Sequence, residues 1–198
     1  MNATNFLVTG VGGQGTLLAS DILAEVGMRA GFDAKKSDVL GLAIRGGSVS
    51  SHVRWGEKVA SPVARTGEID YLLAFEPLEA LRGVPLLHKS SIILCNMQPI
   101  VPISVSSGEA SYPPSDRIRE VLGRAGGAAY YIDAAQEAIR IGSVRVTNVV
   151  MLGAFSSLLD VDLAIWEDVI LARVPEKHVD LNRTAFHTGR ALLGGDTR

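Results

Sequence analysis

The sequence is poor in the residues that bind metal ions and form disulfides. Its 198 residues include one cysteine, Cys95, and four histidines. An iron–sulfur cluster takes four thiolates and a structural zinc ion takes four Cys or His ligands, so we expect no metal in this chain. A single cysteine cannot form an intrachain disulfide, and we expect a cytoplasmic location. Because Cys95 follows the apolar run 92–94, it is predicted to be a packed core thiol.

The sequence also lacks an excess of positive charge and a long apolar run. It has 19 Lys and Arg residues against 21 Asp and Glu residues, which argues against nucleic acid as the main ligand. The apolar-rich stretch Val149–Leu159 is well short of the ~20 residues that cross a bilayer, so no membrane span is predicted. The length suits one domain with a full core. We predict a single domain over residues 1–198, with residues 193–198 as a mobile tail.

Strands and helices are predicted to alternate along most of the chain. Apolar and alternating patterns predict strands at 5–9, 32–36, 49–55, 59–63, 69–75, 91–96 and 128–133. Helical patterns predict helices at 16–30, 77–87, 117–124, 144–159, 163–173 and 178–193, and another after Asp133. This alternation predicts the α/β class, with a Rossmann-like three-layer fold that has a mostly parallel sheet and helices on both faces. Ligands of such sheets bind where the strands end.

Two helix starts carry capping residues. Ser115 or Asp116 is predicted to cap the helix at 117–124. Asp133 is predicted to cap the following helix, with Gln136 three residues later as in a capping box. The residues between 104 and 116 are rich in Ser, Gly and Pro and are predicted to form a loop.

A glycine-rich stretch between the first strand and the first helix is the strongest candidate site. Gly10, Gly12 and Gly15 match the pattern G-x-G-x-x-G, with Gly13 and Gln14 in the variable positions. Glycine lets backbone amides approach a ligand, and a helix N-terminus adds about half a positive charge, so the stretch suits a phosphate. The alternative is a tight turn that packs the helix against the sheet and binds nothing.

A second alternative is that the stretch binds NAD. That function requires an acidic residue at the end of the second strand. Asp33 lies at the start of that predicted strand and Asp38 lies in the loop after it. Neither position fits, so a free-standing NAD-dependent oxidoreductase is the weaker hypothesis.

Arg45, Gly46 and Gly47 form a second candidate cluster, just before a predicted strand. An arginine before two glycines can clamp an anion; equally, it can pair with a carboxylate in a loop. Four further cations could add positive potential near the site, or could be solvated surface residues: Lys35, Lys36, Arg54 and Arg65.

Taken together, the ordered motifs identify a family resemblance. The glycine stretch 10–15, Arg45–Ser48, Ile69–Ala74 and Asn96 resemble the gamma-type domain of 2-oxoacid:ferredoxin oxidoreductases. Two later stretches, YYIDAAQEAIRIGSVRVTNVVMLGAF and LNRTAFHTGRALL, look most like the small subunits of the indolepyruvate-specific members. The resemblance covers nearly the whole chain.

The resemblance implies a function shared with another chain. It implies that this chain is the small subunit of a heteromeric enzyme that decarboxylates an aryl pyruvate oxidatively, forms an acyl-CoA and passes two electrons to ferredoxin. Thiamine diphosphate and the iron–sulfur clusters would belong to a large alpha subunit, which fits the lone cysteine here. This chain would have no catalytic residue and no activity alone.

Coenzyme A carries a diphosphate and a further phosphate. We therefore expect it to be the ligand of the glycine stretch. The cofactor-binding candidates at the subunit interface are Gly10, Gly12, Gly13, Gln14, Gly15, Arg45, Gly46 and Gly47. The competing hypothesis is a non-catalytic structural subunit, whose loops only shape the active site of the thiamine-bearing partner.

Overall fold

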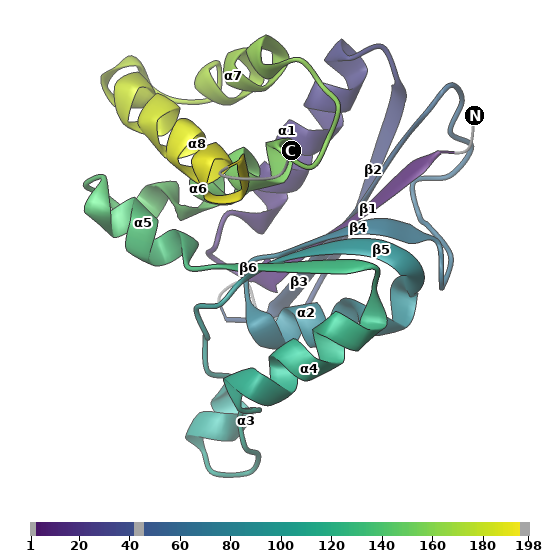
Figure 1. The fold of residues 1–198 in the computed structure, drawn as a ribbon, viewed down its shortest axis with the longest axis vertical. Coiled ribbons are helices and arrows are strands. Elements are labelled where there is room, and N and C mark those ends of the chain that lie inside the picture. The colour runs from purple at the N-terminus through teal and green to yellow at the C-terminus, as the bar shows by residue number, and fades with distance from the viewer. Residues whose placement is uncertain (1–2, 42–45, 195–198) are drawn as a thin grey trace.

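The computed structural model describes residues 3–41 and 46–194, and its strands form one sheet in the order β2-β3-β1-β4-β5-β6 (Figure 1). The strands are β1 (Thr4–Val11), β2 (Asp33–Leu40), β3 (Ser48–Gly56), β4 (Ile69–Ala74), β5 (Leu87–Asn96) and β6 (Ala128–Ile132). β1 pairs with β4, β4 with β5, and β5 with β6 in parallel, whereas β3 is antiparallel to both of its neighbours. The prediction of a mostly parallel sheet is confirmed.

Helices cover both faces of the sheet, as predicted (Figure 1). They are α1 (Thr16–Arg29), α2 (Pro77–Gly83), α3 (Ile103–Ser106), α4 (Ser115–Ala125), α5 (Ala134–Arg140), α6 (Thr147–Ser156), α7 (Leu163–Leu171) and α8 (Val179–Gly194). α1 and α5–α8 lie on one face, and α2 and α4 lie on the other (Figure 1). No helix in the described part of the chain has the length and apolar character needed to cross a membrane.

The alternation of side chains along each strand divides the core into two layers. In β1, Phe6 and Val8 point to the face of α1 and α6, while Leu7 points to the face of α2 and α4. The first layer is the larger and contains most of the buried aromatic residues, among them Trp166 and Phe186. Because both faces are buried, the middle parts of β1, β4 and β5 are apolar, at residues 6–8, 72–74 and 92–95.

The prediction of a strand at 59–63 is wrong. Residues 59–63 form no strand, and the backbone amide of Val59 donates to Asp33 Oδ2 at 2.7 Å instead. Both edges of β3 are already occupied, by β1 and by β2, so a strand after the turn has no place beside β3. β2 pairs with β3 along that edge. It extends to Leu40, beyond the predicted end at Lys36.

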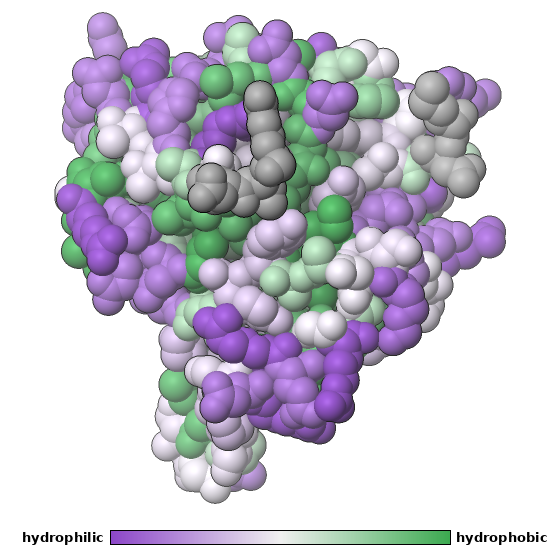
Figure 2. Space-filling model, viewed as in Figure 1, coloured by the Kyte–Doolittle hydropathy of each residue, from purple (hydrophilic) through white to green (hydrophobic). Residues whose placement is uncertain are grey.

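Several local expectations also needed correction. α4 begins at Ser115 with Pro114 as its N-cap, so neither predicted side chain caps it. The predicted loop after β5 contains the short helix α3, and this segment projects from the body of the molecule with Ile103 87% exposed (Figures 1 and 2). Asp133 does cap α5, since Oδ1 accepts from the Gln136 amide at 3.1 Å, as predicted. The first two residues of the predicted tail belong to α8, and 195–198 lie outside the described residues.

Candidate functional site

The glycine turn lies where β1 ends and α1 begins, at the carboxyl edge of the parallel strands. Gly13 has φ 106° and Gly15 has φ 78°, both in the left-handed region. A side chain is strained at these angles, so this turn requires glycine at both positions. Gly15 is the N-cap of α1, and no side chain caps the helix. The turn therefore exposes the first amides of α1 rather than covering them.

The backbone amides of the turn divide into bound and free groups. Gly12 donates to Gly47 O at 2.8 Å, and Gln14 donates to Val11 O at 3.1 Å. The amides of Gly13, Gly15 and Thr16 have no hydrogen-bond partner among the described residues. Free amides at the start of a 14-residue helix form a site for an anion.

Gln14 holds the turn against the neighbouring strand. Its Oε1 accepts from the Val11 amide at 2.8 Å, and its Nε2 donates to Phe75 O, just after β4, at 2.9 Å. Both ends of the side chain amide are thus bound to the backbone of this chain. In this structure Gln14 shapes the site, and the amides beside it are the groups left for a ligand.

The two predicted glycine clusters lie side by side. Gly12 donates to Gly47 O, and Gly46 donates back to Gly12 O at 3.4 Å. Gly46 has φ 76°, which again favours glycine. Arg45, the predicted anion clamp, lies outside the described residues. The structure therefore brings together Gly46 and Gly47 with the first cluster.

A pocket of about 340 Å³ opens beside the turn. Its described lining consists of Val11, Gly12, Gly13, Gly15, Thr16, Leu17, Leu40, Gly41 and Val49. No charged side chain belongs to this lining, so the backbone amides are its main polar donors. An apolar pocket with a few convergent polar groups is the usual form of a small-molecule site.

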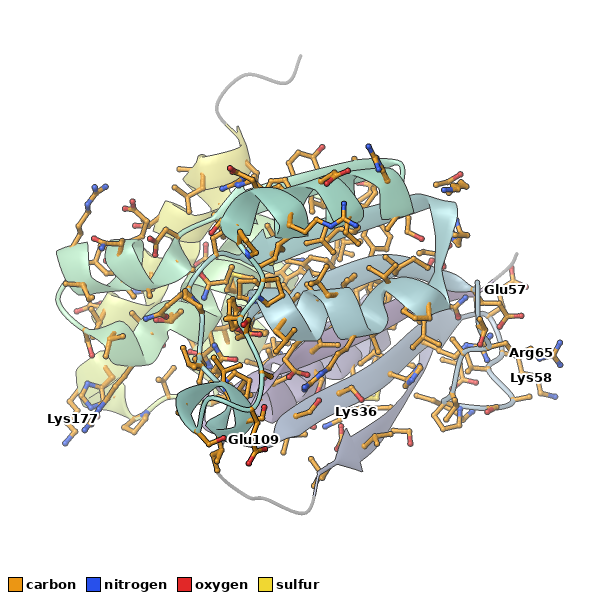
Figure 3. The ribbon with its side chains drawn as sticks, turned by 90° about the horizontal axis from the view of Figure 1, so that it is seen from below. Lys36, Glu57, Lys58, Arg65, Glu109 and Lys177 are labelled. Atoms are coloured by element: carbon orange, nitrogen blue, oxygen red, sulfur yellow. The ribbon has the colours of Figure 1, made fainter. Side chains whose placement is uncertain are left out.

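The four predicted cations do not line this pocket. Lys36 pairs with Asp21 at 2.5 Å and with Asp38 at 3.0 Å, while Lys35 pairs with Asp33 at 3.0 Å. Figure 3 shows Arg65 well away from Lys36. Arg54 Nε donates to Asn5 Oδ1 at 2.6 Å, near the start of β1.

The position of Asp33 argues against NAD. Asp33 pairs with Gly56 at the amino end of β2, whereas Leu40 pairs with Val49 at the edge of the glycine turn. A hydrogen bond from the Val59 amide, helped by Lys35, lowers the pKa of Asp33, so its carboxylate is held in a structural contact. An acid that binds a ribose is needed at the other edge. Asp38, predicted in the loop, instead lies within β2 near that edge, but its carboxylate already accepts from Ser51 Oγ at 2.6 Å and pairs with Lys36 at 3.0 Å.

Two buried acids at the same edge as the turn were missed by the sequence analysis. Glu76 and Glu79 are 1% and 4% exposed. Glu76 accepts from the amides of Glu79 and Ile100 and from the Tyr112 hydroxyl, so it fixes the segment after β5. Glu79 accepts from Ser48 Oγ at 2.5 Å and pairs with Arg82. Burial raises the pKa of Glu79. The only signal of these acids in the sequence was Glu76 directly before Pro77, a pair that is typical of the start of a helix.

Asn96 ties three elements together at this edge. Its Nδ2 donates to Phe75 O at 3.1 Å, and its Oδ1 accepts from the Ala134 amide at 3.0 Å. Asn96 thus links the ends of β4 and β5 to the start of α5. Its place in the family motif is consistent with this architectural role.

The chain offers neither a reactive thiol nor a metal cluster in its described part. Cys95 is fully buried, and burial raises the pKa of its thiol to about 12, so it is a core residue as predicted. Among the described residues, no three Cys, His, Asp or Glu side chains come close enough to hold a metal ion.

Comparison with known proteins identifies the family. The family model described as pyruvate ferredoxin/flavodoxin oxidoreductase matches residues 5–192. This chain belongs to that oxidoreductase family. Curated relatives named indolepyruvate oxidoreductase subunit IorB, from Thermococcus kodakarensis and Pyrococcus horikoshii, are each 38% identical over 192 residues. Each of these alignments covers 96% of this chain and 95% of the relative.

Solved structures of the oxidoreductase family share the fold. The gamma subunit of a keto/oxoacid ferredoxin oxidoreductase from Geobacter sulfurreducens PCA is 27% identical, with a TM-score of 0.71 over 98% of this chain and 99% of that one. The 2-oxoglutarate:ferredoxin oxidoreductase of Magnetococcus marinus, solved with 2-oxoglutarate, coenzyme A and succinyl-CoA bound, is 22% identical with a TM-score of 0.77. All of this chain aligns with 32% of that longer chain, which supports the fold alone.

Proposed function

We propose that this chain is the small subunit of a cytoplasmic 2-oxoacid:ferredoxin oxidoreductase that acts on aryl pyruvates such as indolepyruvate. The assembled enzyme decarboxylates the 2-oxoacid oxidatively, forms an acyl-CoA and passes two electrons to ferredoxin. The full-length match to curated indolepyruvate oxidoreductase subunits supports this assignment. The large partner subunit would hold thiamine diphosphate and the iron–sulfur clusters, as the family resemblance implies; the single cysteine of this chain is compatible with that division.

The free amides of the glycine turn are the main observation in favour of coenzyme A binding by this chain. Coenzyme A bears a diphosphate, and the amides of Gly13, Gly15 and Thr16 lack partners among the described residues. The positive end of α1 adds to their attraction for phosphate. The walls formed by Leu17, Leu40 and Val49 suit the uncharged part of the same molecule. This chain would bind and orient coenzyme A, while bound thiamine diphosphate in the partner would supply the carbon chemistry.

Gly13→Val tests this role in the assembled enzyme. The Cβ atom at Gly13 would meet nothing within 4 Å, so the expected costs are backbone strain of about 1–2 kcal/mol and obstruction of the phosphate. The variant should assemble and decarboxylate the 2-oxoacid. Acyl-CoA formed per carbon dioxide released in a single turnover should fall by about tenfold or more, because charge-assisted hydrogen bonds are lost.

Gly31→Val is the matched control. Gly31 also has a left-handed φ, 92°, and open space around its Cβ position, but it lies at the other end of α1. It should impose similar strain and leave the ratio of acyl-CoA to carbon dioxide unchanged. If both variants lower the ratio equally, or if neither does, the glycine turn is a packing device and the coenzyme A assignment fails.

Arg45→Ala tests the second cluster. Loss of one charge-assisted contact with a phosphate should weaken the apparent affinity for coenzyme A by roughly ten- to a hundredfold. The apparent affinity for the 2-oxoacid should change little. Steady-state titration of both substrates measures the two effects, and an unchanged affinity for coenzyme A would make Arg45 a structural residue.

The structural-subunit hypothesis predicts a different pattern. It is favoured by one observation, the lack of a charged side chain in the described lining of the turn pocket. Under that hypothesis, substitutions in the turn would lower decarboxylation and acyl transfer together. Titrating the isolated chain with NAD checks the remaining alternative, for which the misplaced Asp33 predicts no binding.

A further inference from the structure

A second cavity lies within the helical layer; it shares no lining residue with the pocket of the glycine turn, although Asn148 in its wall packs against Gly15. It measures about 440 Å³ and is bounded by α1, the segment before α6, and the helices α7 and α8. The lining residues on which the argument rests are Ile22, Arg145, Asn148, Ile170, Arg173 and His178. Figure 1 shows these helices gathered on one side of the sheet.

The floor of this cavity is apolar and rigid. Ile22, Val146, Val149 and Ile170 are each 4% exposed or less and belong to the larger core layer. These side chains come from four different elements that pack together. A preformed apolar floor of this size suits the hydrocarbon or aromatic body of a small ligand.

The two arginines in the lining of this cavity carry charge of the same sign. Arg145, Arg173 and His178 line the cavity, and no acidic residue belongs to its described lining. Arg173 is held over α1 by Glu25, at 2.5 Å. The guanidinium of Arg145 forms no ion pair with a described residue. An uncompensated guanidinium beside an apolar floor favours a ligand with a negative head group.

Asn148 supplies an independent polar group. It lies in the first turn of α6, is 9% exposed, and lines the cavity. Its side-chain amide makes no hydrogen bond with the described residues, and its polar atoms are not fully buried, so they remain free for a ligand; the same side chain packs against Gly15. α6 has ten residues, and its N-cap Val146 and its first-turn residues Asn148 and Val149 line the cavity. The positive end of the helix therefore also lies at this wall.

We propose that this cavity binds a small anion with an apolar body, either a carboxylate or a phosphate ester. The body would rest on the floor of Ile22, Val149 and Ile170. The head group would contact Arg145 and the Asn148 amide at the start of α6. The assignment does not depend on coenzyme A binding at the glycine turn.

Calorimetric titration of the whole chain with 2-naphthoate and with 2-naphthyl phosphate tests the proposal. At least one probe should bind saturably with one site per chain, and the tighter probe identifies the head group. Arg145→Ala should weaken it by about tenfold or more, because a charge-assisted contact is lost. Arg145 is exposed, so its removal should leave the fold intact.

Arg140→Ala is the matched control. Arg140 is an exposed arginine on the neighbouring α5, paired with Glu137 at 2.7 Å, and it does not line the cavity. This variant should bind the anionic probe like the wild type. Uncharged 2-naphthylmethanol should bind to the wild type and to Arg140→Ala far more weakly than the anionic probe does. Three results would overturn the proposal: no saturable binding of either anion, equal loss in the two variants, or displacement of the probe by coenzyme A.

Discussion

Two regions of the molecule rely on glycine for opposite reasons. Where α6 crosses α8, a Cβ at Gly153 would collide with Phe186 O, and a Cβ at Gly189 would collide with Val150 O. Both glycines lie within helices and have no positive φ. In the glycine turn, Gly13 has a φ of 106° and nothing within 4 Å of its Cβ position. The crossing lacks space, whereas the turn lacks an allowed conformation for other residues.

The difference separates a packing site from a candidate binding site. At the crossing, the backbone of the partner helix occupies the position that a Cβ atom would take, so glycine allows the two helices to pack closely. At Gly13 the space remains open and faces a pocket. A glycine turn with open space beside it is typical of a place where a ligand approaches the backbone. Substitutions should therefore affect stability at the crossing and function at the turn.

The largest effect is expected for Gly189→Ala. The added methyl group would overlap the Val150 carbonyl and force α6 and α8 apart, which should cost about 3 kcal/mol of unfolding free energy. Gly123→Ala in α4 is the control, because its Cβ would meet only the Tyr131 hydroxyl at 4.0 Å. That change should stabilise the protein by about 0.5–1 kcal/mol, since alanine favours helix. Chemical denaturation measures both, and equal stability of the two variants would contradict the role of the crossing.

Gly15→Ala combines the two kinds of constraint and ranks next. Its φ of 78° costs about 1–2 kcal/mol, and its Cβ would also approach the Asn148 side chain at 2.9 Å. Gly13→Ala should carry the conformational cost alone and lose less stability. Adding Asn148→Ala to Gly15→Ala should recover the crowding part. A double-mutant cycle with no coupling between the two positions would rule out this contact as a constraint.

Gln14→Ala tests how firmly the turn is attached to β4. It removes the contacts with the Val11 amide and Phe75 O, each worth about 1 kcal/mol, so unfolding free energy should fall by roughly 1–2 kcal/mol. Glutamate at this position keeps the acceptor but not the donor to Phe75 O, and should lose part of that amount. If both variants are as stable as the wild type, the turn keeps its shape without this side chain.

The smallest effect concerns pH. Burial raises the pKa of Glu79 above its unfolded value of 4.5, so the native state holds that proton more tightly. This contribution to stability is present below pH 4.5 and is lost as pH rises through the raised native pKa. Glu79→Gln removes the titration. The stability of the wild type minus that of the variant should therefore decrease from about pH 4.5 upward. A difference that rises with pH would show that Ser48 and Arg82 outweigh burial.

The sequence was sufficient to predict the fold class and the position of the glycine turn. The alternation of buried strands with helices predicted the mostly parallel sheet, because local apolar patterns report which faces are covered. The pattern of Gly10, Gly12 and Gly15 predicted a turn at the carboxyl edge, and the left-handed φ of Gly13 and Gly15 is a local backbone reason for glycine there. Cys95 was likewise predicted to be buried from its apolar neighbours.

Features that depend on contacts between distant segments could not be predicted. The wrong strand at 59–63 had a local pattern resembling that of a strand, but β1 and β2 had already filled the edges of β3. The attachment of Gln14 to Phe75 O spans 61 residues, and Glu79 meets Ser48 across 31 residues. Spacing along the chain carries no signal for such pairs.

The sequence by itself therefore determined two features: the mostly parallel sheet with helices on both faces, and the turn that ends the first strand. Periodicity and glycine act through neighbouring residues, so one segment contains the whole cause. Only the tertiary structure placed Gly46 and Gly47 against Gly12, and Arg145, Asn148 and Arg173 around one cavity. Those arrangements arise because a folded core fixes the distances between elements that are independent in the unfolded chain.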